Sequence, residues 1–170
     1  MRKEYFIEAA FVEEKRRHSL DRVDRRILDL LQREGALSVA EVASRTGLST
    51  TTCWRRIQHM EQSGVIRGRV ALLDRSALGL DVTIFAHVKL STQGRDAIAA
   101  FAEAIRERPE VLDCYTTMGE WDFMLRIVTR DIKAYEAFYL DHLSKLPNVQ
   151  SINSSVTVTV IKETTVLPIE

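Results

Sequence analysis

Cysteine is scarce in this chain of 170 residues, and its scarcity excludes several classes of protein. Cys53 and Cys114 lie far apart and fit no zinc or redox spacing, which favours a reduced cytosolic setting. The sequence also lacks a glycine-rich phosphate loop and a nucleophile motif, so we expect no cofactor. Neither a metal site nor a catalytic base is expected from the scattered histidines, His18, His59, His87 and His142.

Long apolar runs are absent as well. No stretch approaches the roughly 18 consecutive apolar residues that a membrane-spanning helix needs. Near the start of the chain, any signal-peptide pattern is interrupted by Glu4, Glu8, Glu13 and Glu14. With 45% apolar residues, the chain can still build one core or two small ones. We therefore expect a cytoplasmic protein with no membrane partner.

The chain has no excess charge of either sign, because 24 basic residues balance 24 acidic ones. Their distribution along the chain is uneven. Residues 19–69 hold nine arginines and six acids, whereas residues 80–170 hold nine basic residues and thirteen acids. Such an asymmetry is typical of a nucleic-acid-binding half joined to a different kind of domain. Ordinary variation of surface charge is the alternative explanation.

Three short helices are predicted in the first half of the chain. Apolar residues recur at helical spacing from Leu20 until Gly35 ends the first helix. Ser38 and Glu41 have the spacing of a capping box at the start of a second helix. The second helix is short, and Gly47 is placed to end it.

The third helix follows the second after a tight turn, which is the outline of a helix-turn-helix. Ser49 can cap this helix, and Gly64 stops it just after Gln62. Residues 66–72 then alternate like a short strand that would serve as a wing or a connector. The fold expected for this half is therefore a winged helix-turn-helix.

The second half of the chain has the order β-α-β-β-α-β, which is the ferredoxin-like pattern of an α+β protein. This fold puts both helices on one face of an antiparallel sheet, so we expect a dimer to cover the other face. The domains expected are an extension over 1–18 (helical or loose, with no function assigned), a helix-turn-helix over 19–72, a linker over 73–81 and a second domain over 82–170. Strands are expected over residues 82–90, 111–118, 122–129 and 149–161, and helices over 96–108 and 132–145.

The third helix has two contrasting sides. On a helical wheel, Cys53, Ile57 and Met60 share one narrow side, which we expect to pack inside the domain. The opposite side is polar and carries no acid. Arginine can bind guanine, glutamine can pair with adenine and threonine can contact a thymine methyl, so this side suits a major groove. The residues best placed at base edges are Thr50, Thr51, Thr52, Trp54 and Arg55, and Gln58 is a further DNA-binding candidate on the same side.

A second group of side chains is expected to contact phosphates, which position a protein on DNA and supply most of its salt-dependent affinity. The solvated face of an ordinary three-helix bundle is the alternative, but the capping box, the tight turn and the following basic segment favour DNA. The group comprises Ser49, Arg56, His59, Arg67 and Arg69, and Ser38 completes the candidate DNA-binding residues.

Two pairs of motifs resemble a known family. LDRVDRRIL at residues 20–28 and LSTTTCWRRIQHMEQSGVI at 48–66 are similar to the DNA-binding half of the Lrp/AsnC, or feast/famine, regulators. CYTTMGEWDF at 114–123 and LPNV at 146–149 are similar to the effector-sensing half. The resemblance implies a transcription regulator that dimerises, often further into octamers, and senses amino acids at interfaces between RAM-type sensing domains.

The same resemblance implies an effector site framed by a turn and by the start of the last strand. Turn N–H groups can hold an α-carboxylate, and the Asp122 carboxylate can hold an α-ammonium, although Asp122 could instead cap its turn. Two positions depart from the family: Asn148 stands where glycine is common, and Ile152 stands where threonine is common and favours an apolar effector side chain. The site residues implied are Thr117, Met118, Gly119, Glu120 and Asp122, with Gln150, Ser151, Ile152 and Ser154 opposite.

The sequence therefore predicts a sequence-specific regulator that binds double-stranded DNA, itself and a small-molecule effector. The effector expected is an amino acid or a related metabolite. Two alternatives remain: an architectural protein that binds DNA with little sequence preference, and an enzyme built on a ferredoxin-like dimer. The enzyme is disfavoured because the second half lacks a paired base and nucleophile.

Overall fold

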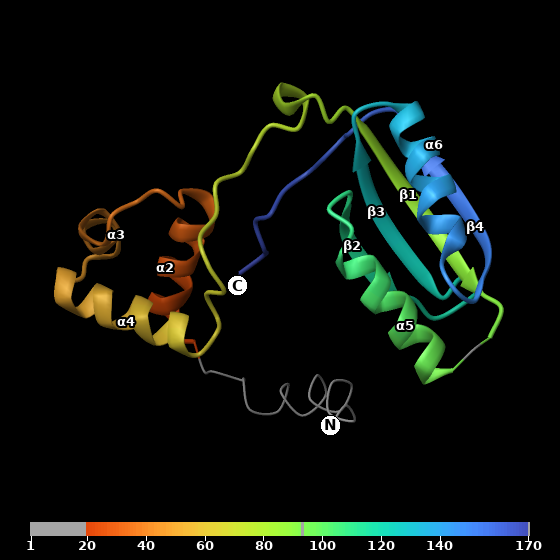
Figure 1. The fold of residues 1–170 in the computed structure, drawn as a ribbon. Helices are drawn as coiled ribbons and strands as arrows, with labels where there is room; N and C mark the ends of the chain where they lie inside the picture. The colour runs from red at the N-terminus through yellow and green to blue at the C-terminus, as the bar shows by residue number, and fades with distance from the viewer. Residues whose placement is uncertain (1–19, 93, 170) are drawn as a thin grey trace. The chain divides into compact units, whose positions relative to one another are not determined.

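The computed structural model describes residues 20–92 and 94–169, and these form two units (Figure 1). One unit contains residues 20–72 together with 163–169, and the other contains residues 73–162. The helix or loose extension considered for residues 1–18 lies outside the described residues. Within the described part of the chain, no helix combines the length and apolar character needed to cross a membrane.

The first unit is built on three helices, as the sequence predicts. Its third helix follows the second after only three residues, which is the arrangement of a helix-turn-helix. Cys53, Ile57 and Met60 are buried on the inner side of the third helix, as their spacing predicts. The helices are α2 (Arg22–Arg33), α3 (Val39–Thr46) and α4 (Thr50–Gln62).

Local signals set the ends of these helices. The hydroxyl of Ser38 accepts the N–H of Glu41 at 3.3 Å, and the carboxylate of Glu41 accepts the N–H of Ser38 at 2.7 Å. This is the expected capping box, and the Ser38 hydrogen bonds hold the pKa of Glu41 below its usual value. Gly47 ends α3 with a φ of 73°, a left-handed conformation that favours glycine. Ser49 then caps α4.

The strand expected over residues 66–72 is wrong. These residues form no strand in the structure, and Val70 and Leu72 are largely exposed. Among the described residues, no other segment pairs with them, and an isolated extended segment has no ladder of hydrogen bonds to hold it. Alternation of apolar residues therefore predicts an extended conformation here but not a strand.

The second unit contains the predicted β-α-β-β-α-β order. Its sheet has the strand order β2-β3-β1-β4, all neighbours being antiparallel. Helices α5 and α6 both lie on one face of this sheet (Figure 1). The strands are β1 (Val82–Leu90), β2 (Val111–Thr116), β3 (Phe123–Thr129) and β4 (Val149–Val156), and the helices are α5 (Arg95–Arg106) and α6 (Ile132–Asp141), with short 3-10 turns at Ser76–Leu78 and Leu143–Lys145.

A single core lies between the sheet and the two helices. Ile84, Ala86 and Val88 alternate along β1 and are fully buried against this core, which includes Phe101 of α5 and Phe138 of α6. The opposite side of the sheet carries no described helix (Figure 1). That side presents the ion pair between Arg126 and Asp113 and the contact between the rings of His87 and Trp121.

The last strand is shorter than predicted. Alternation continues to residue 161, yet β4 ends at Val156. Its partner is β1, which begins at Val82, and the final ladder contact is the hydrogen bond from Thr157 N–H to the carbonyl of Thr83 at 2.9 Å. The partner strand therefore ends before the alternating sequence does, and Val158 is left almost fully exposed.

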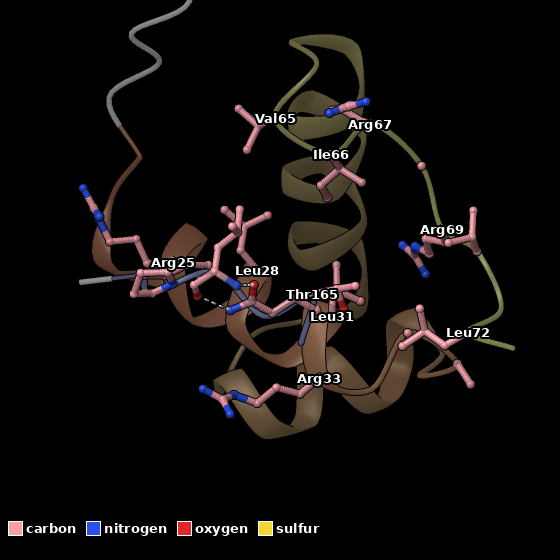
Figure 2. A pocket seen from close by; sticks show the side chains of 18 of the residues that line it. Arg25, Leu28, Leu31, Arg33, Val65, Ile66, Arg67, Arg69, Leu72 and Thr165 are labelled. Carbon is pink, nitrogen blue, oxygen red and sulfur yellow. Dashed lines mark hydrogen bonds between the residues drawn. The ribbon is translucent and has the colours of Figure 1, made fainter. Parts of the chain in front are cut away.

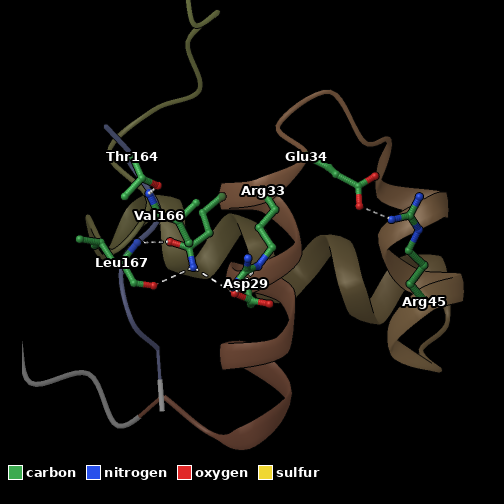
Figure 3. Close-up of polar contacts among 8 residues, drawn as sticks. Asp29, Arg33, Glu34, Arg45, Thr164, Val166 and Leu167 are labelled. Atoms are coloured by element: carbon green, nitrogen blue, oxygen red, sulfur yellow. Dashed lines mark hydrogen bonds and ion pairs between the residues drawn. The ribbon is translucent and has the colours of Figure 1, made fainter. Parts of the chain in front are cut away.

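After β4 and the residues that follow it, the chain continues into a segment that belongs to the first unit. Residues 163–169 belong with α2 and its neighbours, and the side chain of Gln32 hydrogen-bonds to the backbone of Leu167 (Figure 3). The first unit is therefore assembled from two separate stretches of sequence.

Candidate DNA-binding and effector sites

The outer side of α4 is open to solvent. Thr50, Thr51, Trp54 and Arg55 are exposed, and Trp54 retains 54% of its accessible surface. Arg55 makes no hydrogen bond or ion pair with any of the described residues. The structure thus brings together on one surface four of the five residues predicted to meet base edges.

The remaining predicted base-edge residue, Thr52, and the further DNA-binding candidate Gln58 are less available. Thr52 is half-buried, and its hydroxyl oxygen accepts a hydrogen bond from Ser49 at 2.8 Å. Gln58 is also half-buried, and its amide donates to Glu61 at 2.9 Å. Because both groups already have partners on α4, either must rearrange before it can contact a base.

The residues predicted to contact phosphates fall into two groups. Arg67 and His59 are exposed, and Arg67 has no polar partner among the described residues. Arg69 lies 3.6 Å from the carboxylate of Glu61, an exposed pair that water and salt weaken. The hydroxyls of Ser38 and Ser49 cap helices, as described above.

Arg56 differs from the phosphate contact that the sequence predicts. Its Nη1 atom lies 2.7 Å from the carboxylate of Asp21 and 2.7 Å from that of Asp24, both at the start of α2. Asp24 and Asp21 raise the pKa of Arg56. The pKa of Asp21 lies below its usual value, mainly because Asp21 accepts the backbone N–H of Asp24 and next because it accepts a hydrogen bond from Arg56. The interaction joins α4 to α2 across more than thirty residues of sequence.

The predicted effector turn lies between β2 and β3. The N–H and the hydroxyl of Thr117 bond to the carbonyls of Asp122 and Trp121, at 2.9 and 2.6 Å, and so close the turn. Gly119 has a φ of 138°, and a side chain there would meet open space. The backbone N–H groups of residues 118–120 have no acceptor among the described residues. These amides form an open set of donors suited to an anionic group.

Asp122 is already occupied in this structure. One of its carboxylate oxygens accepts the N–H of Leu90 at 2.8 Å, and the other lies 3.7 Å from the ammonium of Lys89. The carboxylate therefore ties the turn to the end of β1, which differs from the cap within its own turn that the sequence leaves open. Glu120 is exposed and makes no polar contact with the described residues.

The residues predicted on β4 do not act as one surface. Ser151 pairs with Lys89 and lies on the side of the sheet away from the helices. Ile152 and Ser154 lie on the helix side, where Ile152 packs on the core and Ser154 hydrogen-bonds to the hydroxyl of Tyr135. Gln150 falls at an irregularity in the β1–β4 pairing. In one protomer, β1 and β3 separate this strand from β2, so the two halves of the predicted site do not meet across one surface.

A groove of about 1000 Å³ lies elsewhere in the first unit (Figure 2). Its walls are the apolar side of α2, the segment 65–72 and the docked residues 165–169. Leu28 and Leu31 give the groove an apolar wall, with Arg25 and Arg33 on the same helix (Figure 2). Arg67 and Arg69, which the sequence predicts to contact phosphates, also line this groove (Figure 2).

Comparison with known proteins identifies both halves of the chain. The sequence profile of a winged helix-turn-helix DNA-binding domain matches residues 20–67, and that of the Lrp/AsnC ligand binding domain matches residues 83–167. The chain belongs to the Lrp/AsnC family. It is 37% identical to the DNA-binding transcriptional activator DecR of Escherichia coli strain K12, over 89% of this chain and 99% of DecR. It is 34% identical to the glutamate uptake regulatory protein of Zymomonas mobilis, over 88% of this chain and 91% of that protein.

Solved structures agree with this assignment. A transcriptional regulator from Neisseria meningitidis in complex with L-Met has a TM-score of 0.84 and 37% identity, covering 88% of this chain and 96% of its own. AsnC of Escherichia coli has a TM-score of 0.80 and 26% identity, covering 87% and 98%. The predicted family, the α+β fold and the function of a DNA-binding regulator with a ligand-binding domain are confirmed for this Lrp/AsnC protein.

Two contacts between distant residues of this Lrp/AsnC protein are not predictable from local sequence patterns. Arg56 pairs with Asp21 and Asp24, and the spacing of the two aspartates signals only a helix cap. Gln32 holds Leu167 from 135 positions away, and no local pattern marks that contact.

Proposed function

We propose that this protein regulates transcription by placing the outer side of α4 in the major groove of double-stranded DNA, and that it does so in the cytoplasm. The exposed Arg55, with no polar partner among the described residues, is the observation that carries the proposal. It sits beside Thr51 and Trp54 near the start of α4, the part of a helix-turn-helix that meets base edges. Its guanidinium suits the O6 and N7 acceptors of guanine.

The proposed effector is an amino acid bound at the turn between β2 and β3. Its α-carboxylate would accept the backbone N–H groups of residues 118–120, which have no acceptor among the described residues. Glu120 is available for the α-ammonium, because Asp122 is already held by Leu90 and Lys89. A similar protein from Neisseria meningitidis binds L-Met, which supports this class of effector.

Self-association is part of the proposal. One side of the sheet carries no described helix, and His87, Trp121 and Met124 are only half-buried there. A second copy would cover this side, and two α4 helices could then read half-sites about one helical turn apart. In the same assembly, a neighbouring copy would complete the effector site that one protomer leaves open. Regulation by binding, not catalysis, accords with the names of the curated relatives.

In vitro selection from a random duplex library tests the DNA proposal. The purified full-length protein should enrich a two-fold symmetric sequence and bind it at least about a thousandfold more tightly than random duplex at physiological salt. Equal binding of the selected and random duplexes would show an architectural protein instead.

Thermal shift with each of the twenty amino acids tests the effector proposal. We expect one or more of them to raise the unfolding temperature, because a ligand that binds only the folded state stabilises it. Glu120→Gln should weaken this shift while leaving the ligand-free unfolding temperature unchanged. Asp122→Ala should lower the ligand-free temperature as well, since it removes the acceptor for Leu90 N–H. A wild-type protein that no amino acid stabilises contradicts the effector proposal.

A further inference from the structure

The interaction between Arg56 and the start of α2 is built differently from an ordinary surface ion pair. The Nη1 atom of Arg56 lies 2.7 Å from Asp21 Oδ2 and 2.7 Å from Asp24 Oδ1. The side chains of Arg56 and Asp24 keep only 30% and 14% of their accessible surface, whereas that of Asp21 keeps 50%. One guanidinium thus bridges two carboxylates in a partly buried network, where geometry is better defined than in exposed pairs.

The carboxylates of Asp21 and Asp24 also cap the start of α2 by accepting backbone N–H groups. Asp21 Oδ1 accepts the N–H groups of Val23 and Asp24, both at 2.8 Å, while Asp24 Oδ2 accepts the N–H of Asp21 at 3.2 Å. All four carboxylate oxygens are therefore used, one on each residue for the helix cap and one for Arg56. If Arg56 moved to a phosphate, two carboxylates would be left facing each other without a cation.

The position of Arg56 on α4 gives this network a mechanical consequence. Arg56 follows Arg55 directly, so the two side chains leave the helix about 100° apart. The buried contacts of α4 come from Cys53, Ile57 and Met60, and apolar packing is not directional. The bond to two fixed carboxylates is directional, and it restricts rotation of α4 about its own axis. Any such rotation of α4 would carry Arg55 away from the major groove of the DNA.

We propose that Arg56 positions the recognition helix by pinning it to the capped end of α2, and that it does not contact DNA. This inference rests on the proposed function, because it needs α4 to be the helix that reads bases. It replaces the phosphate contact predicted from sequence with a positioning role. Selectivity between sequences, and not only stability, should therefore depend on Arg56, Asp21 and Asp24.

The experiment uses Asp24→Asn and Arg56→Gln in the full-length protein. The asparagine keeps an oxygen that can accept the N–H of Asp21, so the cap is preserved while the charge that holds Arg56 is removed. Fluorescence anisotropy gives the affinities for the selected duplex and for random duplex between about 50 and 200 mM salt. All measurements are made well below the unfolding temperature of each variant, determined by circular dichroism.

We expect both variants to reduce the ratio of selected to random affinity on the order of tenfold, with the salt slope unchanged. Arg56→Lys, which keeps a cation for the aspartates, should recover part of the ratio. As matched control, Arg67→Gln should lower the salt slope by about one unit and leave the ratio unchanged.

Opposite results identify the other roles. An Arg56 that contacts phosphate would make Asp24→Asn bind more tightly and Arg56→Gln lose about one unit of salt slope, which overturns the inference. A fall in unfolding temperature with an unchanged ratio also overturns it, because the network would then be structural only. If the wild type itself shows no preference for the selected duplex, the proposed function fails, independently of Arg56.

Discussion

The side-chain amide of Gln32 hydrogen-bonds to both the backbone N–H and the backbone carbonyl of Leu167. Its oxygen accepts the N–H of Leu167 at 2.9 Å, and its nitrogen donates to the carbonyl of Leu167 at 3.0 Å (Figure 3). A neighbouring strand would make the same pair of hydrogen bonds. The same nitrogen lies 3.1 Å from Asp29, which fixes the orientation of the amide on α2.

Replacing Gln32 by alanine should release residues 163–169 from α2. Both hydrogen bonds to Leu167 are lost, and the Leu167 amide should exchange with solvent faster, by an amount equivalent to about 1 kcal/mol of opening free energy. Hydrogen exchange measured by NMR reports this amide directly. Gln32→Glu keeps the acceptor and loses the donor, so its exchange should be intermediate. Equal exchange in all three proteins would show that the contact does not hold the tail.

Arg55 and Arg67, both exposed and without a polar partner among the described residues, should fail in different ways. Arg55→Ala should relax the base preference by about 1–3 kcal/mol at one position of the selected site. Arg67→Ala should weaken binding to all sequences alike and flatten the salt dependence by about one unit. Binding to a panel of single-base variants at several salt concentrations separates the two effects. Identical, sequence-independent losses in both variants would contradict this division of roles.

Asn148 occupies a backbone conformation that glycine adopts more readily than residues with a side chain. Its φ is 64°, in the left-handed region, and its carbonyl accepts the N–H of Ser91 at 2.8 Å. Asparagine tolerates this conformation better than other residues with a side chain, and glycine adopts it without strain. Asn148→Ala should therefore lower the free energy of unfolding by about 1 kcal/mol, whereas Asn148→Gly should not. Urea denaturation of the two variants measures the difference, and equal stabilities would argue against backbone strain.

Acid should destabilise the DNA-binding unit through its helix caps. Hydrogen bonds at the caps lower the pKa of Asp21, mainly through the Asp24 N–H, and that of Glu41, mainly through the Ser38 hydroxyl. Because these carboxyls have a lower pKa in the folded state, their contribution is complete above their unfolded values of 3.8 and 4.5. It disappears as the pH falls through the folded values. NMR titration should show both carboxyls below the unfolded values, and Glu41→Gln should make unfolding less dependent on pH.

Interactions between near neighbours in the sequence are the part of the structure that the sequence predicts well. The capping box of Ser38 and Glu41 and the stop at Gly47 depend on residues three or four positions apart. The inner side of α4 follows from the helical period alone. Strand length is predicted less well, because β4 ends where β1 no longer provides a partner. The alternating residues after Val156 carry no signal of that limit.

The candidate sites show the same division. Exposure of Thr51 and Arg55 follows from the wheel, whereas the fate of Arg56 depends on two aspartates more than thirty positions away. The side chain of Arg56 leaves α4 next to its buried inner side. Only the packing of α4 on α2 decides whether its guanidinium contacts a phosphate or a carboxylate. Likewise, an aspartate such as Asp122 is a residue type suited to binding a ligand, but one of its carboxylate oxygens already accepts the N–H of Leu90.

The docked tail makes the DNA-binding unit discontinuous in sequence. A fragment that stops at residue 72 would lack residues 163–169, which Gln32 holds through Leu167, and the groove along α2 would lose one of its walls. An autonomous version of this unit would need residues 163–169 supplied again, as a separate peptide or through a short fusion after residue 72. Separating the two units of this regulator therefore requires cutting the chain at two positions, one on each side of the sensing unit.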